Sequence, residues 1–207
     1  MVTEKYLKVD DRNLTAYNLR QPYKNRRNGS VTNLQTKNLT KIALCVALCC
    51  ITAGIAFPLP FTPGMVTALT ITMSLTAYVL SPKETFIVLF IYILMGGIGL
   101  PVFAGGSGPG KLFGPVGGFY FAWLVAYPVL SFVKGRDINF KRYVIANILT
   151  AMPITYAGGI ISMVIVMDIS FWQAFSMSVF PFIPGDLIKT CAAAFLGAKL
   201  NQRLKNF

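Results

Sequence analysis

The segment Phe180–Thr190 reads FPFIPGDLIKT and places an acid, Asp186, and a base, Lys189, inside an otherwise apolar stretch. The chain reads VIVMDISFWQAFSMSVF on the N-terminal side and CAAAFLGA on the C-terminal side, so both flanks are hydrophobic. Residues three apart lie on one face of a helix. We therefore expect Asp186 and Lys189 to point the same way from a hydrophobic helix.

The composition of the whole chain is that of a membrane protein. Of its 207 residues, 55% are hydrophobic and 13% are charged, and the mean hydropathy is +0.60. A soluble domain of this length is much more polar. Apolar runs near the roughly 20 residues needed to cross a bilayer recur six times. They cover approximately residues 40–57, 64–80, 85–103, 113–133, 143–167 and 171–198.

The distribution of basic residues predicts the orientation. If the N-terminus is cytoplasmic, Lys83, the basic loop 134–142 and the basic tail from Lys199 all fall on the inner side, and Lys111 is the basic loop residue left outside. Cytoplasmic loops of membrane proteins carry such an excess of Lys and Arg. We predict an all-α, multi-pass protein of the cell membrane with six transmembrane helices and both termini in the cytoplasm.

The net charge of +12 does not indicate a nucleic-acid partner. Basic residues beside hydrophobic spans already serve membrane orientation and contact with anionic lipids. We divide the chain into a polar, basic cytoplasmic extension, residues 1–38, and a six-helix membrane domain, residues 39–207. The extension is either a flexible tail or a segment that contacts the membrane surface or a partner.

Several kinds of chemistry are excluded. The chain has no histidine, which removes imidazole catalysis and histidine metal ligation. Its cysteines lie in apolar runs without CxxC spacing, where cysteine acts as a small hydrophobic residue. We expect no enzyme, no metal site and no cofactor bound by this chain. An intramembrane enzyme that uses Asp186 and Lys189, or a self-sufficient transporter, is a remote alternative. A channel is disfavoured because we expect no polar residues in the inner halves of the spans.

Three irregular segments fall on the predicted outer side: PLPFTPG (58–64), GGSGPGK (105–111) and PFIPGDLIK (181–189). Irregular backbone at membrane depth persists only where it is buried in protein or lines a cavity. An ionised residue at mid-membrane costs about 2.5 to 3.5 kcal/mol on insertion scales. We therefore expect an outward cavity that holds Asp186 and Lys189. The alternatives are a purely structural ion pair, or a Lys189 that reaches the membrane interface.

The loop from Gly105 to Lys111 fits the GxxxxGK pattern of a phosphate-binding loop, but Leu112 stands where Ser or Thr would hold magnesium. We expect no nucleotide site, so the chain has no energy source of its own. The surrounding glycines, including Gly114 and Gly118 at GxxxG spacing, indicate close helix packing, ligand contact or both.

The motifs GLPVFAGG (99–106), GPVGG (114–118) and PFIPGDLIK (181–189), in this order, resemble the BioY family, the biotin-binding S components of energy-coupling factor (ECF) importers. The resemblance covers about residues 57–200. It implies a six-helix subunit that captures biotin at the outer face beneath the loop between the first two helices. It also implies a transmembrane coupling partner, the T component, and two cytoplasmic ATPases that use ATP while the subunit topples to deliver biotin inward.

The resemblance implies roles for individual residues. Asp186 and Lys189 match the polar pair of the family's vitamin site, with Lys189 facing a carboxylate or carbonyl group. Ala43 and Ala47 match the AxxxA feature that docks on the T component. Further aromatic, hydroxyl and glycine positions are assigned to the substrate site: Phe61, Thr67, Gly99, Phe103, Gly117 and Gly118. Phe57 and Phe119 are expected to help cover the apolar part of the ligand.

One segment departs from the family pattern. After PFTP the family usually continues Val-Pro-hydrophobic-Thr-x-Gln-Thr, whereas here Met65 replaces the proline and Leu69 replaces the glutamine. A pocket with fewer polar groups would suit a sulfur-ring acid without the ureido group, such as lipoate, because an unpaired polar ligand group costs about 1 to 3 kcal/mol. Biotin is the first expectation and lipoate the alternative.

Overall fold

The structure, a computed structural model, describes residues 36–205. The predicted N-terminal extension therefore lies almost entirely outside the described residues. Ile42 to Phe207 form one compact unit, and the fold is described within it.

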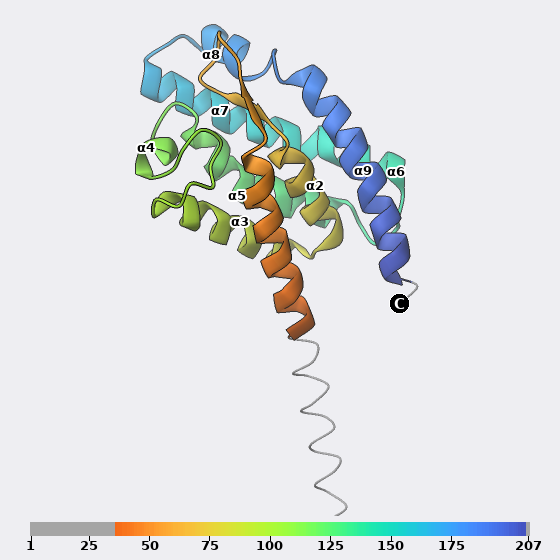
Figure 1. Ribbon diagram of the computed structural model, residues 1–207. Coiled ribbons are helices and arrows are strands. Elements are labelled where there is room, and N and C mark those ends of the chain that lie inside the picture. Colours follow the sequence, from red (N-terminus) through yellow and green to blue (C-terminus); the bar gives the residue numbers. More distant parts are fainter. Residues whose placement is uncertain (1–35, 206–207) are drawn as a thin grey trace, which may run out of the picture. The chain divides into compact units, whose positions relative to one another are not determined.

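The described chain is mostly helical (Figure 1). A first helix, Thr36–Ala53, leads into a hairpin of two short strands, β1 (Ala56–Pro58) and β2 (Met65–Thr67), which pair antiparallel. The helices that follow are α2 (Leu69–Val79), α3 (Pro82–Gly97), α4 (Pro109–Leu112), α5 (Gly117–Val133), α6 (Phe140–Ala146), the π-helical segment η1 (Asn147–Ala151), α7 (Met152–Met167), α8 (Phe171–Ser178) and α9 (Ile183–Lys205).

Each of the six predicted apolar runs contains helix, but their lengths differ. Two helices, Thr36–Ala53 and the continuous Phe140–Met167, are long and apolar enough to cross a membrane, and the pair α8 and α9 forms a third candidate with a 46° bend. The helix α2 has only 11 residues and α5 has 17. The count of six spans and the orientation stay predictions.

The predicted helices over 40–57 and 64–80 are too long. The hairpin occupies their adjoining ends, with Ala56 paired to Thr67 and Pro58 to Met65. The prolines at 58, 60 and 63 explain this difference, because proline has no amide hydrogen for a helical bond. The connection between the first helix and α2 is therefore partly a β-hairpin.

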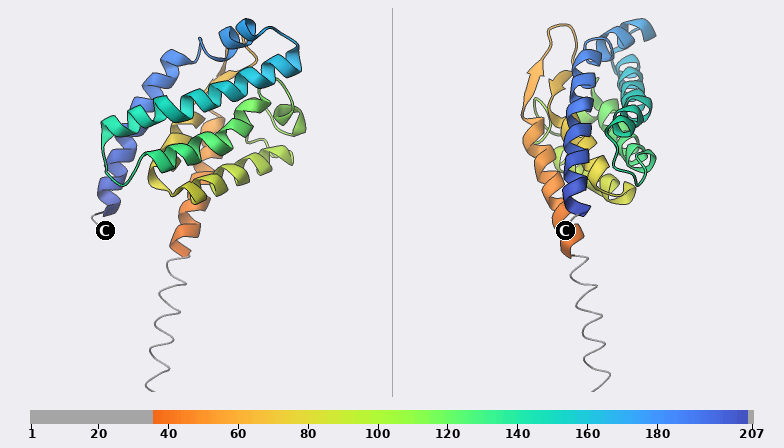
Figure 2. Two further views of the ribbon diagram at one scale, coloured as in Figure 1. Left: turned by 180° about the vertical axis from the view of Figure 1, so that it is seen from behind. Right: turned by 90° about the vertical axis from the view of Figure 1, so that its right-hand side faces the viewer.

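Helix packing places α5 at the centre of the unit. It lies between α3 and α7, which run alongside it, and α2 packs against α9 (Figure 2). Glycine allows the close approach of α5 and α7: a Cβ atom on Gly118 of α5 would clash with the backbone oxygen of Gly158 on α7. The packing interpretation of the GxxxG motif is therefore confirmed at Gly118.

A buried polar network extends along α2, away from the ion pair. The Asn147 side chain donates hydrogen bonds to Ser74 Oγ at 2.9 Å and to the Tyr78 hydroxyl at 3.1 Å. Tyr78 in turn donates to the Tyr143 backbone oxygen at 3.0 Å and stacks on the Tyr143 ring. The expectation that the inner halves of the spans hold no polar residues is therefore wrong at Ser74, Tyr78 and Asn147. These groups bond to one another, which joins α2 to α6 and η1.

The C-terminal end of α2 is held by a lysine. Lys134, the residue after α5, donates to the backbone oxygens of Ala77, Tyr78 and Leu80 at 2.5, 2.7 and 2.6 Å. The last carbonyls of a helix have no partner within the helix and carry partial negative charge. The Lys134 ammonium group donates hydrogen bonds to these carbonyls and carries the opposite charge, so Lys134 links the end of α5 to the end of α2.

Candidate ligand-binding site

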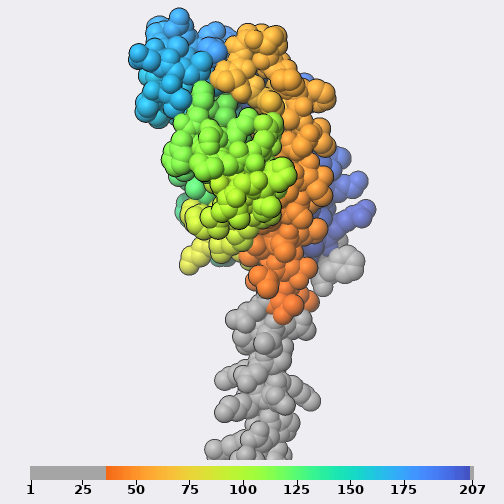
Figure 3. Space-filling model, turned by 60° about the vertical axis from the view of Figure 1, so that its left-hand side comes forward, coloured from red at the N-terminus to blue at the C-terminus, as the bar shows by residue number. Residues whose placement is uncertain are grey.

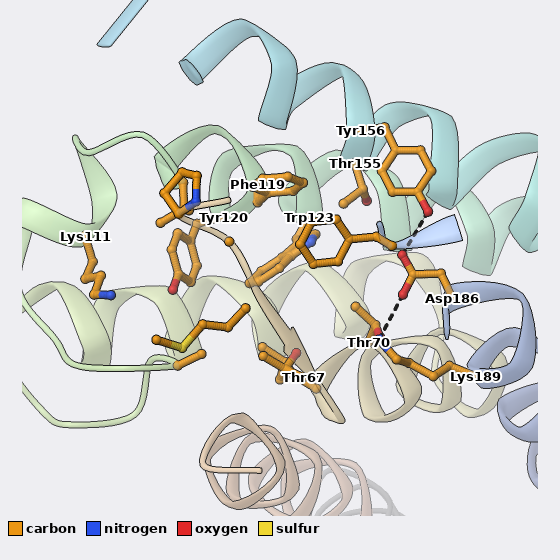
Figure 4. A pocket seen from close by; sticks show the side chains of 17 residues that line it. Thr67, Thr70, Lys111, Phe119, Tyr120, Trp123, Thr155, Tyr156, Asp186 and Lys189 are labelled. Carbon is orange, nitrogen blue, oxygen red and sulfur yellow. Dashed lines mark hydrogen bonds and ion pairs between the residues drawn. The ribbon is translucent and has the colours of Figure 1, made fainter. Parts of the chain in front are cut away.

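A cavity of about 710 Å³, counting the space at its mouth, lies within this unit (Figure 4). The hairpin and the start of α2 form one side of the cavity, α5 and α7 another, and α9 contributes the charged pair. All of the lining residues belong to the single compact unit.

Asp186 and Lys189 are paired inside this cavity. Lys189 Nζ lies 2.9 Å from Asp186 Oδ1, and each side chain is 15% exposed. Both residues stand in the first two turns of α9, just after Pro184 and Gly185, so their three-residue spacing sets them on one face. The expected common direction of the two side chains is confirmed.

A third residue completes this polar group. The Tyr156 hydroxyl on α7 donates a hydrogen bond to Asp186 Oδ2 at 2.9 Å. Both oxygens of Asp186 are therefore engaged, each by a different donor. A carboxylate can accept additional hydrogen bonds at each oxygen, so Asp186 is held in place and still has capacity for a ligand N–H group.

Three buried polar atoms in the cavity wall have no hydrogen-bond partner: Thr70 Oγ1, Trp123 Nε1 and Thr155 Oγ1. They are the full set of such side-chain atoms within residues 36–205. Trp123 and Thr155 are each only 8% exposed. Buried polar atoms in folded proteins are nearly always bonded. Their concentration around one cavity indicates a site built for a ligand with both donors and acceptors.

A smaller hollow of about 320 Å³ adjoins the ion pair on its other side. It shares Thr70, Thr155 and the Asp186–Lys189 pair with the main cavity and continues to Ser74 and Asn147. The ion pair therefore stands between the main cavity and the buried polar network of α2.

Aromatic rings form the apolar wall. Phe119, Tyr120 and Trp123 project from one face of α5, and Phe182 reaches in from the turn between α8 and α9. Tyr120 and Trp123 meet edge to face with ring centroids 4.9 Å apart, and Phe119 lies 6.5 Å from Phe182. Such a wall suits a flat or sulfur-containing ring.

The hairpin and the glycine-rich loop both contribute to the cavity lining and contact one another, and the space-filling view shows the two segments side by side (Figure 3). A Cβ atom on Gly105 would lie 2.5 Å from Met65 Cε, and one on Gly64 would lie 2.9 Å from the Phe182 ring. Gly105 also has a φ of +71°, which glycine adopts most easily. The loop sequence therefore permits a contact that a larger residue would obstruct.

The structure brings together three of the eight residues assigned to the substrate site. These three residues, which all line the cavity, are Thr67, Asp186 and Lys189. Phe61 does not line the cavity, because it lies in the hairpin turn and is 58% exposed. Gly99 also lies outside the lining, at the end of α3 with a φ of +106°.

The remaining three assigned residues serve packing. Phe103 is buried against Tyr92 and Tyr120 and fills the space over Gly96. Gly117 and Gly118 begin α5, where a Cβ atom on Gly117 would meet the Leu112 backbone oxygen and one on Gly118 would meet that of Gly158. None of these three lines the cavity. Of the two further aromatic residues, Phe119 lines it, whereas Phe57 is 68% exposed.

Sequence reasoning did not assign several lining residues to the site. Tyr156 and Thr155 sit in an apolar helix without any local motif. Lys111 was noted as a basic loop residue and as the lysine of the GxxxxGK pattern, but it was not assigned to the site. The spacing of the aromatic residues 119, 120 and 123 marks one face of α5 and was an available signal. Met65 and Leu69, the two departures from the family pattern, both line the cavity.

The predicted docking residues lie away from the cavity. Ala43 and Ala47 are exposed on the first helix, one turn apart. Val46 and Cys49, on an adjacent face of this helix, are buried. The helix therefore presents its small residues outward, and the docking role stays a prediction.

Comparisons with known proteins agree on one family. The model of the BioY family matches residues 24–206. The chain is 34% identical over 153 residues to the probable biotin transporter BioY of Bacillus subtilis (strain 168), covering 70% of this chain and 80% of that protein. It is 32% identical over 182 residues to the biotin transporter BioY2 of Lactococcus lactis subsp. cremoris (strain MG1363), covering 84% and 95%.

A solved structure gives the same result. The crystal structure of the S-component for biotin from an ECF-type ABC transporter matches with a TM-score of 0.75 and 25% identity, over 82% of this chain and 93% of that one. The all-helical S-component fold expected from the motifs is thereby confirmed, and so is the expectation of a membrane protein that is not an enzyme. The chain belongs to the BioY family.

Proposed function

We propose that this chain is the biotin-binding S component of an ECF-type vitamin importer. The observation that carries the proposal is the gathering of Thr70, Trp123 and Thr155, with their unbonded polar atoms, around the Asp186–Lys189 pair in one cavity. The relatives named as biotin transporters support the same ligand.

The chemistry of biotin suits this cavity. Its ureido ring offers two N–H donors and a carbonyl acceptor, and Asp186 can accept while Lys189 and Trp123 can donate. The threonine hydroxyls can do either. The aromatic wall of α5 covers the fused sulfur-containing ring. Each polar atom left unpaired in a buried site costs about 1 to 3 kcal/mol, so the pairing also gives selectivity.

The lipoate alternative is less favoured. Met65 and Leu69 do make part of the lining apolar, as expected from the sequence. The opposite side of the cavity, however, retains unpaired groups on Thr155 and Trp123. A dithiolane ring has no N–H or carbonyl group to pair with them.

The proposed import cycle requires partners. We propose that a T component docks on the exposed Ala43 and Ala47 and that two cytoplasmic ATPases use ATP to drive delivery, while this chain binds no cofactor. In this proposal the chain captures biotin at the outer face of the membrane and then topples to deliver it inward. The alternative of a self-sufficient transporter predicts biotin accumulation against a gradient in cells that lack these partners.

Titration of the purified, ligand-depleted protein with biotin and with lipoate tests the ligand. We expect saturable binding of one biotin per chain and at least 100-fold weaker binding of lipoate. Mass spectrometry of the small molecule that copurifies gives an independent reading. Saturable binding of lipoate with none of biotin would contradict the proposal.

A further inference from the structure

Lys111 places an uncompensated positive charge in the cavity. Three charged residues line it, Lys111, Asp186 and Lys189, which gives a net charge of +1. Asp186 and Lys189 neutralise one another at 2.9 Å. Lys111 lies at the far end of the cavity from this pair (Figure 4). The two ends therefore differ: one is a neutral group of donors and acceptors, and the other is a cation.

The surroundings of Lys111 contain no anion. Lys111 is half-buried on α4, and its ammonium group lies beside Gly105, 3.4 Å from the position of a Cβ atom there. Within residues 36–205 the Lys111 ammonium group forms no ion pair or hydrogen bond, although the Lys111 backbone amide donates to the Gly108 oxygen at 3.1 Å. Tyr120 and Met65 line the same cavity, and the Tyr120 ring stands on the Lys111 side in Figure 4. An ammonium group in such a partly desolvated place attracts an anion more strongly than one in open water.

We propose that Lys111 binds the carboxylate of the ligand, and that the ligand lies with its ureido ring at the Asp186–Lys189 end. This inference rests on the proposed function and names the polarity of binding at the same site. It differs from the sequence-based option in which Lys189 faces the carboxylate, because Lys189 already has a carboxylate partner in Asp186. A monoanion pairs with the one uncompensated charge among the described lining residues when its carboxylate lies beside Lys111.

The sequence supports a specific role for this lysine. Lys111 is the basic residue that the predicted topology leaves in an outer loop, and the loop glycines beside it leave its ammonium group uncovered by side chains of their own. A charged hydrogen bond contributes about 1.5 to 3 kcal/mol, which corresponds to a factor of roughly 10 to 150 in affinity.

Comparing biotin with biotinamide, its neutral amide, tests the inference. Both are titrated into the purified full chain, into Lys111→Met, which keeps the length but not the charge, and into Lys111→Arg, which keeps the charge. Lys83→Met, an exposed lysine on α3 far from the cavity lining, is the matched control. We expect the unchanged protein and Lys83→Met to prefer biotin over biotinamide by at least tenfold. Lys111→Met should bind biotin 10- to 100-fold more weakly and biotinamide within about twofold of the unchanged protein, while Lys111→Arg retains most of the preference.

Lys189→Met probes the opposite end and should weaken biotin and biotinamide by the same factor, because the proposed orientation places the ureido ring, which both ligands share, at Lys189. Equal losses for both ligands in Lys111→Met, or no loss for either, would overturn the assignment of the carboxylate to Lys111 and leave the biotin proposal intact. A selective loss of the acid preference in Lys189→Met would mean that the carboxylate lies at Lys189 and that the ligand is bound the other way round. Failure of the unchanged protein to bind biotin would instead contradict the proposed function.

Discussion

Tyr156 on α7 donates a 2.9 Å hydrogen bond to Asp186 on α9. Lys189 occupies the other carboxylate oxygen at the same distance. Asp186 is therefore held by side chains from two helices, α7 and α9. Its position in the cavity depends on how these two helices pack.

Tyr156→Phe removes the hydroxyl and keeps the ring. We expect about tenfold weaker binding of biotin, because one hydrogen bond to a charged group is lost and Asp186 is less well fixed. Calorimetric titration measures the change. Tyr143→Phe, which removes a buried-network hydroxyl outside the cavity lining, is the control and should leave affinity within twofold. Equal affinities for Tyr156→Phe and the unchanged protein would show that the Tyr156 bond does not position Asp186.

Asp186→Asn and Lys189→Met each leave the partner as an unpaired charge that is only 15% exposed. Single substitutions should lower the free energy of unfolding by about 2 to 4 kcal/mol, and the double variant should lose less than the sum of the two. Thermal or chemical unfolding of the unchanged protein, the two single variants and the double variant in detergent gives the interaction free energy between the two side chains. Strictly additive losses would mean that the two side chains do not interact in solution.

Gly118→Ala tests whether this glycine serves packing. The added methyl group would meet the Gly158 backbone oxygen and force α5 and α7 apart. Overpacking of this kind costs about 1 to 3 kcal/mol. Biotin affinity should fall as well, because these two helices carry Trp123 and Thr155. Gly110→Ala, where nothing lies within 4 Å of the new atom, should change neither property. A stable Gly118→Ala protein that loses only biotin binding would restore the direct contact that the sequence suggested.

Lys134→Met leaves carbonyl groups at the end of α2 without their donor. We expect a loss of about 2 kcal/mol and a Tm lower by about 4 to 8 °C in a thermal unfolding scan. Lys83→Met has no such bonds to lose and serves as the control. If both variants unfold at the same temperature, Lys134 does not stabilise the end of α2.

Ala43→Trp together with Ala47→Trp fills the small-residue face of the first helix. Both positions are exposed and lie outside the cavity lining, so biotin affinity should stay within twofold. Copurification with a coexpressed T component should fall at least tenfold, because bulky residues prevent close helix approach. Ser substitutions at both positions keep the small size and should retain assembly. Loss of biotin binding with intact assembly would refute the docking role.

The sequence was sufficient for the general architecture because hydropathy and helical periodicity are local properties. Asp186 and Lys189 could be paired in advance, since a three-residue spacing on a helix fixes their common direction. The hairpin was missed, because Met65–Thr67 is too short and too apolar to differ from a helix start. Phe61 and Phe103 were assigned to the site by chemical type, yet one faces outward and the other fills the space over Gly96.

By itself, the sequence determined the membrane class, the absence of histidine chemistry, the family and the charged pair on the last helix. Only the tertiary structure decided which residues meet in the cavity. Tyr156 and Lys111 are both far from Asp186 in the chain. Helix packing decides that Tyr156 bonds to Asp186 and that Lys111 lies at the other end of the cavity (Figure 4). Contacts between distant parts of the chain produce no periodic pattern in the sequence. The neutral end and the cationic end of the site could therefore be assigned only from the tertiary structure.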